Sequence, residues 1–261
     1  METLNPIPAW QIAIAFFALL TATVEAGVAL GRRAGWKGSE GPNATFMSVM
    51  GAVLGLVSLV MGFSYSMAGS RFDQRKQLLV QEVNALGTSY LQANLLDDPA
   101  RSKMRDLLRD LVDARVARWD DWLDSARSRQ AAAQSERFQE ELWELVAAEA
   151  RRDPQSLNTA HVVHSVSDVI DAIAARTAIL RNRLPETILW MLLVAAVISA
   201  ALIGYACGKS HERNLIATTA FAAILAVVTF ALFDLERPRR GLIRADQQVL
   251  VDFQSGIQAE H

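Results

Sequence analysis

Cysteine is almost absent from this chain of 261 residues, which contains only Cys207. A single cysteine excludes internal disulfides and metal sites built from cysteine clusters. Aromatic residues make up only 7% of the chain, although 51% of its residues are apolar. The formal net charge is −2, whereas nucleic-acid-binding proteins present a basic field. These shortages argue against a disulfide-stabilised, cysteine-metal or nucleic-acid-binding protein, but they do not indicate what the protein does.

Charge is missing from four long segments, residues 3–24, 41–70, 187–208 and 214–233. Each is long enough to cross roughly 30 Å of hydrocarbon at about 1.5 Å per residue. Basic residues follow the first segment and only Glu2 precedes it, so we expect a retained anchor and not a secretory signal. The sequence therefore predicts an all-α integral membrane protein with transmembrane helices at about 9–31, 44–70, 186–208 and 214–234.

The polar insert between the second and third segments, residues 71–185, carries nearly balanced charge. Its apolar residues recur every three or four positions, which is the period of a helix. Pro99 and Pro154 interrupt this pattern, and Ser156 is a candidate N-cap for the helix that follows. We predict four regions: membrane helices in 1–70, a helical cytoplasmic domain in 71–185, membrane helices in 186–236, and a cytoplasmic amphipathic tail in 237–261.

The basic residues near the membrane ends predict the orientation. Four spans place both termini and the insert on one side, and that side has more arginine and lysine than the two short loops of the other. Cytoplasmic flanks carry such an excess. We therefore expect a multi-pass protein of a bacterial inner membrane, with both termini and the insert in the cytoplasm.

Small residues mark one face of the second predicted span. They recur at steps of three and four, at Ser48, Gly51, Gly55, Ser58, Gly62, Ser66 and Gly69. Val53, Val57, Val60 and Met67 occupy the opposite face, where we expect lipid or a neighbouring helix. One hypothesis is tight packing, because helices in lipid associate through close backbone approach. The other is that this small-residue face lines a narrow ion pathway on an axis shared by several subunits. The two hypotheses are compatible.

The second span has no helix-breaking signal where charge returns. Leu79, Val83, Leu86 and Tyr90 continue the helical period, and a glycine such as Gly87 inside a helix costs only about 1 kcal/mol. We predict one rod that leaves the membrane and couples the insert to the span.

Three stretches together resemble the bestrophin-like membrane proteins of bacteria: GFSYSMAGSRFDQRKQLLVQEVNALGTSYL, RLPETILW and DLERPRRGLIRADQQVL. The residues that match the family pattern are Arg71, Asp73, Arg75, Glu82, Asn84, Gly87, Tyr90, Pro238 and Gly241. The resemblance is more distant to the true bestrophins, which are pentameric anion channels, and it implies a homo-oligomer. The span lacks a repeated phenylalanine constriction, and no acidic run follows the fourth span, so anion selectivity and calcium gating do not carry over.

Several charged residues are further candidates. Glu25 lies inside or beside the first span, where a carboxylate marks a functional site or pairs with a basic neighbour. Arg71, Asp73 and Arg75 lie at the junction where the second span meets the insert. Three tail arginines are candidates for anionic lipid headgroups, namely Arg237, Arg239 and Arg240. Val249, Leu250 and Phe253 predict a short amphipathic helix on the membrane or under the bundle, as an anchor or as a gate.

No catalytic motif is present, and His161 and His164 lack companions for a metal site, so we expect no enzyme activity, metal or cofactor. The sequence favours a homo-oligomeric ion channel, with membrane lipids and inorganic ions as its partners. The alternative is a non-conducting scaffold or sensor that binds a partner through its cytoplasmic helices. A transporter is disfavoured because no inverted repeat or interrupted helix is evident.

Overall fold

The structure is a computed structural model that describes residues 8–35, 42–120, 125–181, 186–210, 215–235 and 247–259. These residues form helices and short connections and contain no strand. The helices are α1 (Ala9–Gly35), α2 (Ala44–Gln92), the 3₁₀ turn η2 (Ala93–Leu95), α3 (Ala100–Asp120), α4 (Ser125–Arg152), α5 (Leu157–Arg181), α6 (Glu186–Lys209), α7 (Leu215–Leu235) and α8 (Gln248–Ala259). The predicted all-α fold is confirmed.

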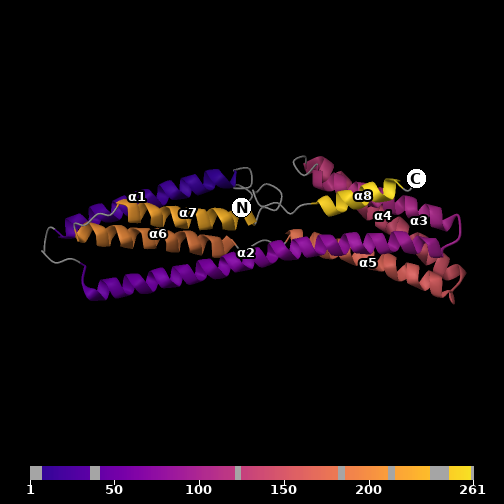
Figure 1. The fold of residues 1–261 in the computed structure, drawn as a ribbon, viewed down its shortest axis with the longest axis horizontal. Coiled ribbons are helices and arrows are strands. Elements are labelled where there is room, and N and C mark those ends of the chain that lie inside the picture. Colours follow the sequence, from indigo (N-terminus) through magenta and orange to yellow (C-terminus); the bar gives the residue numbers. More distant parts are fainter. Residues whose placement is uncertain are drawn as a thin grey trace. The chain divides into compact units, whose positions relative to one another are not determined.

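Four of these helices, α1, α2, α6 and α7, are long and apolar enough to cross a membrane. The chain divides into two compact units: unit 1 contains 1–72 and 183–244, and unit 2 contains 73–182 and 245–261. Helix α2 is continuous from the first unit into the second, as Figure 1 shows, so the predicted uninterrupted rod is confirmed. We treat its charge-free part, 44–70, as the spanning part.

Two side-chain caps explain where helices begin. The Asn43 carboxamide oxygen accepts a hydrogen bond from the Phe46 N–H at 2.8 Å, so α2 starts immediately after Asn43. The Ser156 hydroxyl accepts one from the Thr159 N–H at 3.1 Å, which confirms Ser156 as the cap of α5.

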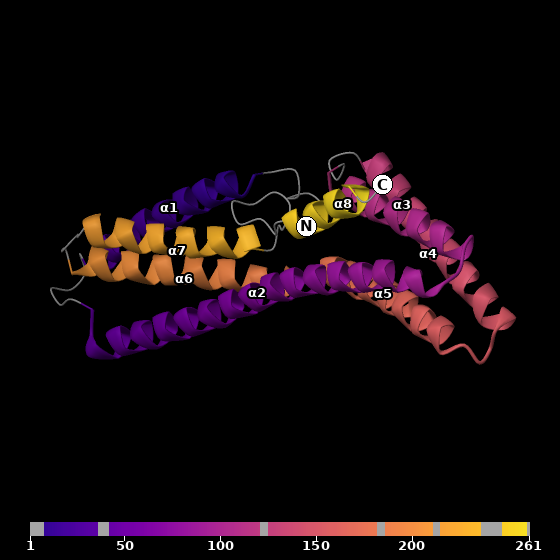
Figure 2. The same ribbon diagram turned by 45° about the vertical axis from the view of Figure 1, so that its right-hand side comes forward.

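Unit 1 is held together by an apolar core and by one very close helix contact. Helices α1, α6 and α7 run side by side (Figures 1 and 2), and α2 adds Val57, Met61 and Ala68 to the core. A Cβ on Gly204 would lie 2.2 Å from the Val24 carbonyl oxygen, and one on Gly31 would lie 2.2 Å from that of Tyr205. The backbones of α1 and α6 therefore touch at a place where only glycine fits.

Unit 2 has its own core, formed by α3, α4, α5, η2 and the second part of α2. The apolar residues that continue the helical period of the rod, Leu79, Val83, Leu86 and Tyr90, are buried in this core. Helix α8 closes this core with Leu250 and Ile257. Val249 instead lies exposed. The apolar face of α8 is therefore used inside unit 2, and the predicted amphipathic helix of the tail is present as Gln248–Ala259.

Candidate functional site: the small-residue face of α2

The small-residue face of α2 is open in the single subunit. Ser48, Gly51, Gly55, Ser58, Gly62 and Ser66 are exposed, and Gly69 is half-buried. A Cβ built on any of the four glycines would meet no atom of a neighbouring residue within 4 Å. Within the described part of unit 1, this face therefore packs against nothing.

The opposite face of α2 explains why the small residues point outward. Val57 is buried, and Val53 and Val60 pack against the same core, so the neighbour expected on this face is the rest of unit 1. Met67 differs from these valines because it is exposed. Burial of this valine face turns the small residues, on the other side of the helix, away from the unit.

Bulky side chains border the small-residue face. Leu56, Leu59 and Phe63 are exposed on α2. At about 100° per residue, they lie on one flank of the small-residue face, between it and the buried face. Exposed apolar side chains in the spanning part contact lipid or another helix, so this flank is available to a second subunit.

Two serines of this helix, Ser58 and Ser64, are satisfied locally. The Ser58 hydroxyl donates to the Leu54 carbonyl oxygen at 2.9 Å, and the buried Ser64 hydroxyl donates to that of Val60 at 2.8 Å. A hydroxyl that donates to the preceding turn keeps its oxygen lone pairs as acceptors. Ser58 therefore presents a weakly polar oxygen on the small-residue face without an unsatisfied donor.

Of the four candidate charges, Glu25 lies on α1, whereas the other three follow one another on α2. Glu25 is exposed in the middle third of α1, whereas Arg71 directly follows the charge-free part of α2. Arg71 is half-buried and its Nη2 lies 3.9 Å from the Met67 sulfur. In unit 2, Asp73 is exposed and Arg75 is buried. Arg237, Arg239 and Arg240 lie outside the described residues.

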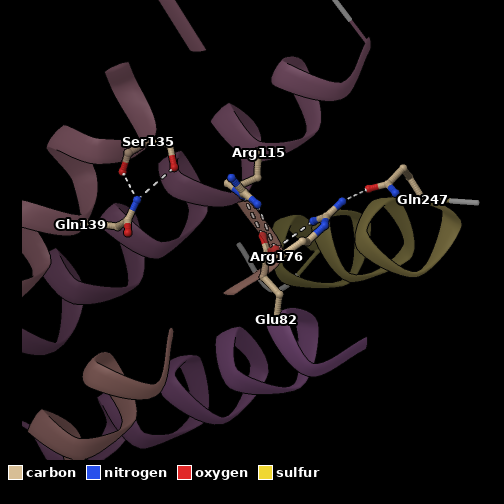
Figure 3. A network of polar contacts seen from close by, with 6 residues as sticks. All are labelled: Glu82, Arg115, Ser135, Gln139, Arg176 and Gln247. Carbon is tan, nitrogen blue, oxygen red and sulfur yellow. Dashed lines mark hydrogen bonds and ion pairs between the residues drawn. The ribbon is translucent and has the colours of Figure 1, made fainter. Parts of the chain in front are cut away.

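Unit 2 contains a buried charge cluster in which the Glu82 carboxylate is surrounded by arginine (Figure 3). Arg115 of α3 donates from Nε and Nη2 to the two Glu82 oxygens, at 2.7 and 2.9 Å, and Arg176 of α5 donates from Nη1 at 2.9 Å. The other Nη of Arg176 donates to the Gln247 carboxamide oxygen. All four side chains are buried. The cluster joins α2, α3, α5 and the residue before α8.

The environment of the cluster shifts its pKa values. Burial alone would raise the pKa of Glu82, but the charges and hydrogen bonds of Arg115 and Arg176 outweigh it and hold that pKa below the ordinary value. Burial lowers the pKa of Arg176, and the Glu82 charge opposes this effect. Because arginine stays protonated in proteins, the cluster is an ionised carboxylate between two guanidinium groups.

Sequence reasoning missed this cluster, although the residues carried a signal. Glu82 falls among the inward apolar positions of the rod, and Arg115 falls in the apolar stripe of α3. A charged residue on a buried face needs an opposite charge on another buried face. Pairing the charges on inward faces would have identified Glu82, Arg115 and Arg176 as partners.

The described residues contain no group of three histidine, cysteine or acidic side chains placed to hold a metal ion. His161 and His164 are both exposed on α5. His164 Nδ1 lies 3.8 Å from the Asp168 carboxylate, one turn further along the same helix. These side chains lie on a solvated helix face.

Four membrane-length helices, together with a helical unit joined through α2, define an all-helical multi-span membrane protein. The family model for the Bestrophin-like domain matches residues 12–250. The chain belongs to this bestrophin-like family, which confirms the resemblance seen in the sequence.

Solved structures show the same fold. A crystal structure of a bacterial bestrophin homolog from Klebsiella pneumoniae gives a TM-score of 0.71 at 13% identity, covering 94% of this chain and 97% of that chain. A single-residue variant of that homolog gives 0.72 at 14% identity, covering 96% and 97%. A variant described only as a membrane protein gives 0.70 at 14% identity, covering 95% and 97%. No curated protein matches the chain in sequence.

Proposed function

We propose that this protein is a homo-oligomeric ion channel, not an enzyme, whose subunits surround a central pathway lined by the small-residue face of α2. The observation that supports this most is the open face itself, where glycine and serine point away from the subunit while the valine face is buried. Membership of the bestrophin-like family supports the same assignment, because the resemblance to true bestrophins implies channels.

The properties of the face favour an ion path over contact with lipid. Its pathway candidates are Ser48, Gly51, Gly55, Ser58, Gly62, Ser66 and Gly69. Glycine exposes backbone carbonyl oxygens, and serine adds hydroxyl oxygens, so a ring of such helices offers ions oxygen contacts in a narrow channel. The flank with Leu56, Leu59 and Phe63 supplies apolar contact to the next subunit. A pentamer is our working number, and it rests on the bestrophin resemblance alone.

The remaining assignments follow from charge placement. We propose an inner-membrane location, with both termini and residues 71–185 in the cytoplasm, because basic residues are in excess on that side. Arg71, Asp73 and Arg75 stand at the cytoplasmic junction of the pathway helix, and Glu25 stands on α1 within unit 1. Anionic lipid headgroups are the proposed ligands of the tail arginines, namely Arg237, Arg239 and Arg240.

The test is current through the purified protein in planar lipid bilayers. Gly55→Leu narrows the proposed pathway, so we expect single-channel conductance to fall at least about tenfold, by analogy with hydrophobic constrictions that gate by dewetting. Ala220→Leu is the matched control, because Ala220 is a small exposed residue of another membrane-length helix, α7. Mass measurement of the oligomer must show the same assembly for both variants.

Two results would contradict the proposal. One is the absence of wild-type current across several salts and pH values. The other is equal conductance for Gly55→Leu and Ala220→Leu in intact oligomers. In either case, retention of a specific partner by residues 71–185 would favour the scaffold hypothesis.

A further inference from the structure

We infer that α8 is a regulatory clamp. Arg176 ties the residue that precedes α8 to the Glu82 carboxylate of α2, and release of α8 loosens the rod that carries the proposed pathway. The clamp lies wholly within unit 2 (Figure 3). Its effect on current rests on the proposed channel function, whereas its effect on the rod does not.

The first step is that α8 depends on docking for its helical structure. It has 12 residues, and isolated helices of this length are marginal in water. Leu250 is fully buried and Ile257 nearly so, in the core that also contains Val83 and Leu86 of α2. The Phe253 ring packs near Gly87, since a Cβ there would lie 3.5 Å from the ring. Docking of α8 therefore covers the inward side of the rod.

The second step is that polar bonds hold α8 at both of its ends. At the start, Gln247 is buried and its side chain accepts from Arg176, while its backbone oxygen accepts from the Leu250 N–H at 2.9 Å. Toward the end, Arg109 Nε donates to the Ile257 carbonyl oxygen at 3.3 Å. The Gln254 carboxamide donates to the Asp113 carboxylate at 2.6 Å. The bond at the start is the one that shares a guanidinium with Glu82.

The third step is that this shared guanidinium couples the tail to α2. Arg176 is one of the two cations that balance a fully buried carboxylate, so its position is set by Glu82 as well as by Gln247. A buried hydrogen bond to a charged group is costly to leave unmade. Loss of the Gln247 acceptor therefore frees the start of α8 and leaves Arg176 incompletely satisfied beside the α2 carboxylate.

Hydrogen exchange on the full-length protein tests this coupling. Gln247→Met removes the acceptor at nearly constant length. Gln248→Met is the matched control, because the exposed Gln248 carboxamide donates to the Asp252 carboxylate within α8 at 2.8 Å. Its loss leaves the Gln247–Arg176 bond in place.

We expect exchange in residues 248–259 and 79–90 to accelerate at least about tenfold in Gln247→Met. In the control, exchange should stay unchanged in 79–90 and rise by no more than about twofold in 248–259. Phe253→Ala, which undocks α8 without touching the cluster, should accelerate both segments as well.

The outcomes separate the clamp from the channel proposal. Equal exchange in Gln247→Met and Gln248→Met, or acceleration of 248–259 with 79–90 unchanged in both undocking variants, would overturn the coupling. Where the wild type conducts, open probability should shift at least about twofold in Gln247→Met and Phe253→Ala but not in Gln248→Met. An unchanged open probability would overturn the regulatory role. A wild-type protein that carries no current would contradict the proposed channel function. The hydrogen-exchange result would still show whether α8 and α2 are coupled.

Discussion

The two compact units hold their helices together by different chemistry. In unit 1, α1 and α6 meet backbone to backbone through glycine, with Gly204 against the Val24 carbonyl. In unit 2, α2, α3 and α5 meet around the buried Glu82 carboxylate. Lipid gives helices little hydrophobic reason to associate, so close backbone approach matters there. In the more polar unit 2, apolar burial drives packing, and a buried charge cluster favours one arrangement of the helices.

Glycine itself has two opposite settings within unit 1. The added Cβ that would collide with α1 at Gly204 would meet open space at Gly55. Both positions are glycine, and they differ only in what lies opposite: the α1 backbone at Gly204, and no neighbouring residue at Gly55. The α1–α6 contact is complete within one subunit, whereas the small-residue face of α2 still lacks a partner in the described structure.

The largest expected effect comes from neutralising the charge cluster. Glu82→Gln leaves Arg115 and Arg176 buried without a counter-charge, so we expect the free energy of unfolding of unit 2 to fall by about 3–5 kcal/mol. Hydrogen exchange in α3 and α5 of detergent-solubilised protein measures this loss, because it resolves the unit by segment.

The control is an ion pair at the surface of the same unit. Asp106 pairs with Arg109 at 3.0 Å and is largely exposed, so Asp106→Asn should cost less than about 1 kcal/mol. Similar losses for Glu82→Gln and Asp106→Asn would show that the buried cluster contributes no more than a surface pair, and the contrast between the units would fail.

A smaller effect is expected at the glycine contact of unit 1. In Gly204→Ala, the new methyl carbon would lie 2.2 Å from the Val24 carbonyl oxygen, so α1 and α6 must separate. Overpacking of this kind costs about 1–3 kcal/mol. A lower thermal unfolding midpoint in detergent would measure it, with exchange rising in α1 and α6 first. An unchanged midpoint would mean that the two helices are not in backbone contact.

The sequence predicted the helices well and their contacts unevenly. The charge-free segments, the rod through Gly87 and the Ser156 cap follow from local rules that need no tertiary information. The α1–α6 contact was not predicted, although both helices carry glycine pairs four residues apart, Gly27 with Gly31 and Gly204 with Gly208. The longer small-residue series of α2 gave the stronger sequence signal, yet it packs against nothing within the described part of unit 1. Which glycines meet depends on which helices are neighbours, and one sequence does not supply that.

The cluster of unit 2 also predicts a dependence on pH. The folded pKa of Glu82 is lowered, so its contribution to stability is complete above the unfolded value, about 4.3, and is lost as the pH falls toward the folded value. Because intrinsic amide exchange itself slows on acidification, the quantity to compare is protection, the ratio of the intrinsic to the observed rate. Acidification below the unfolded pKa should lower protection in unit 2 more than at the α1–α6 contact of unit 1. Partial protonation makes this effect smaller than that of Glu82→Gln. If the two units respond equally to acid in Glu82→Gln, the difference seen in the wild type comes from the Glu82 carboxylate.

The smallest expected effect distinguishes the two roles of the small-residue face. Gly55→Ala adds a methyl group where the subunit has open space, so subunit stability should rise by up to about 1 kcal/mol through helix propensity. If the face packs tightly against another subunit, the same methyl group weakens the oligomer, and dissociation on dilution detects this. If the face borders an open path, the oligomer is unchanged and conductance falls only slightly. Because the gain in the subunit is the same in both cases, the response of the oligomer alone reports whether the face packs tightly at Gly55.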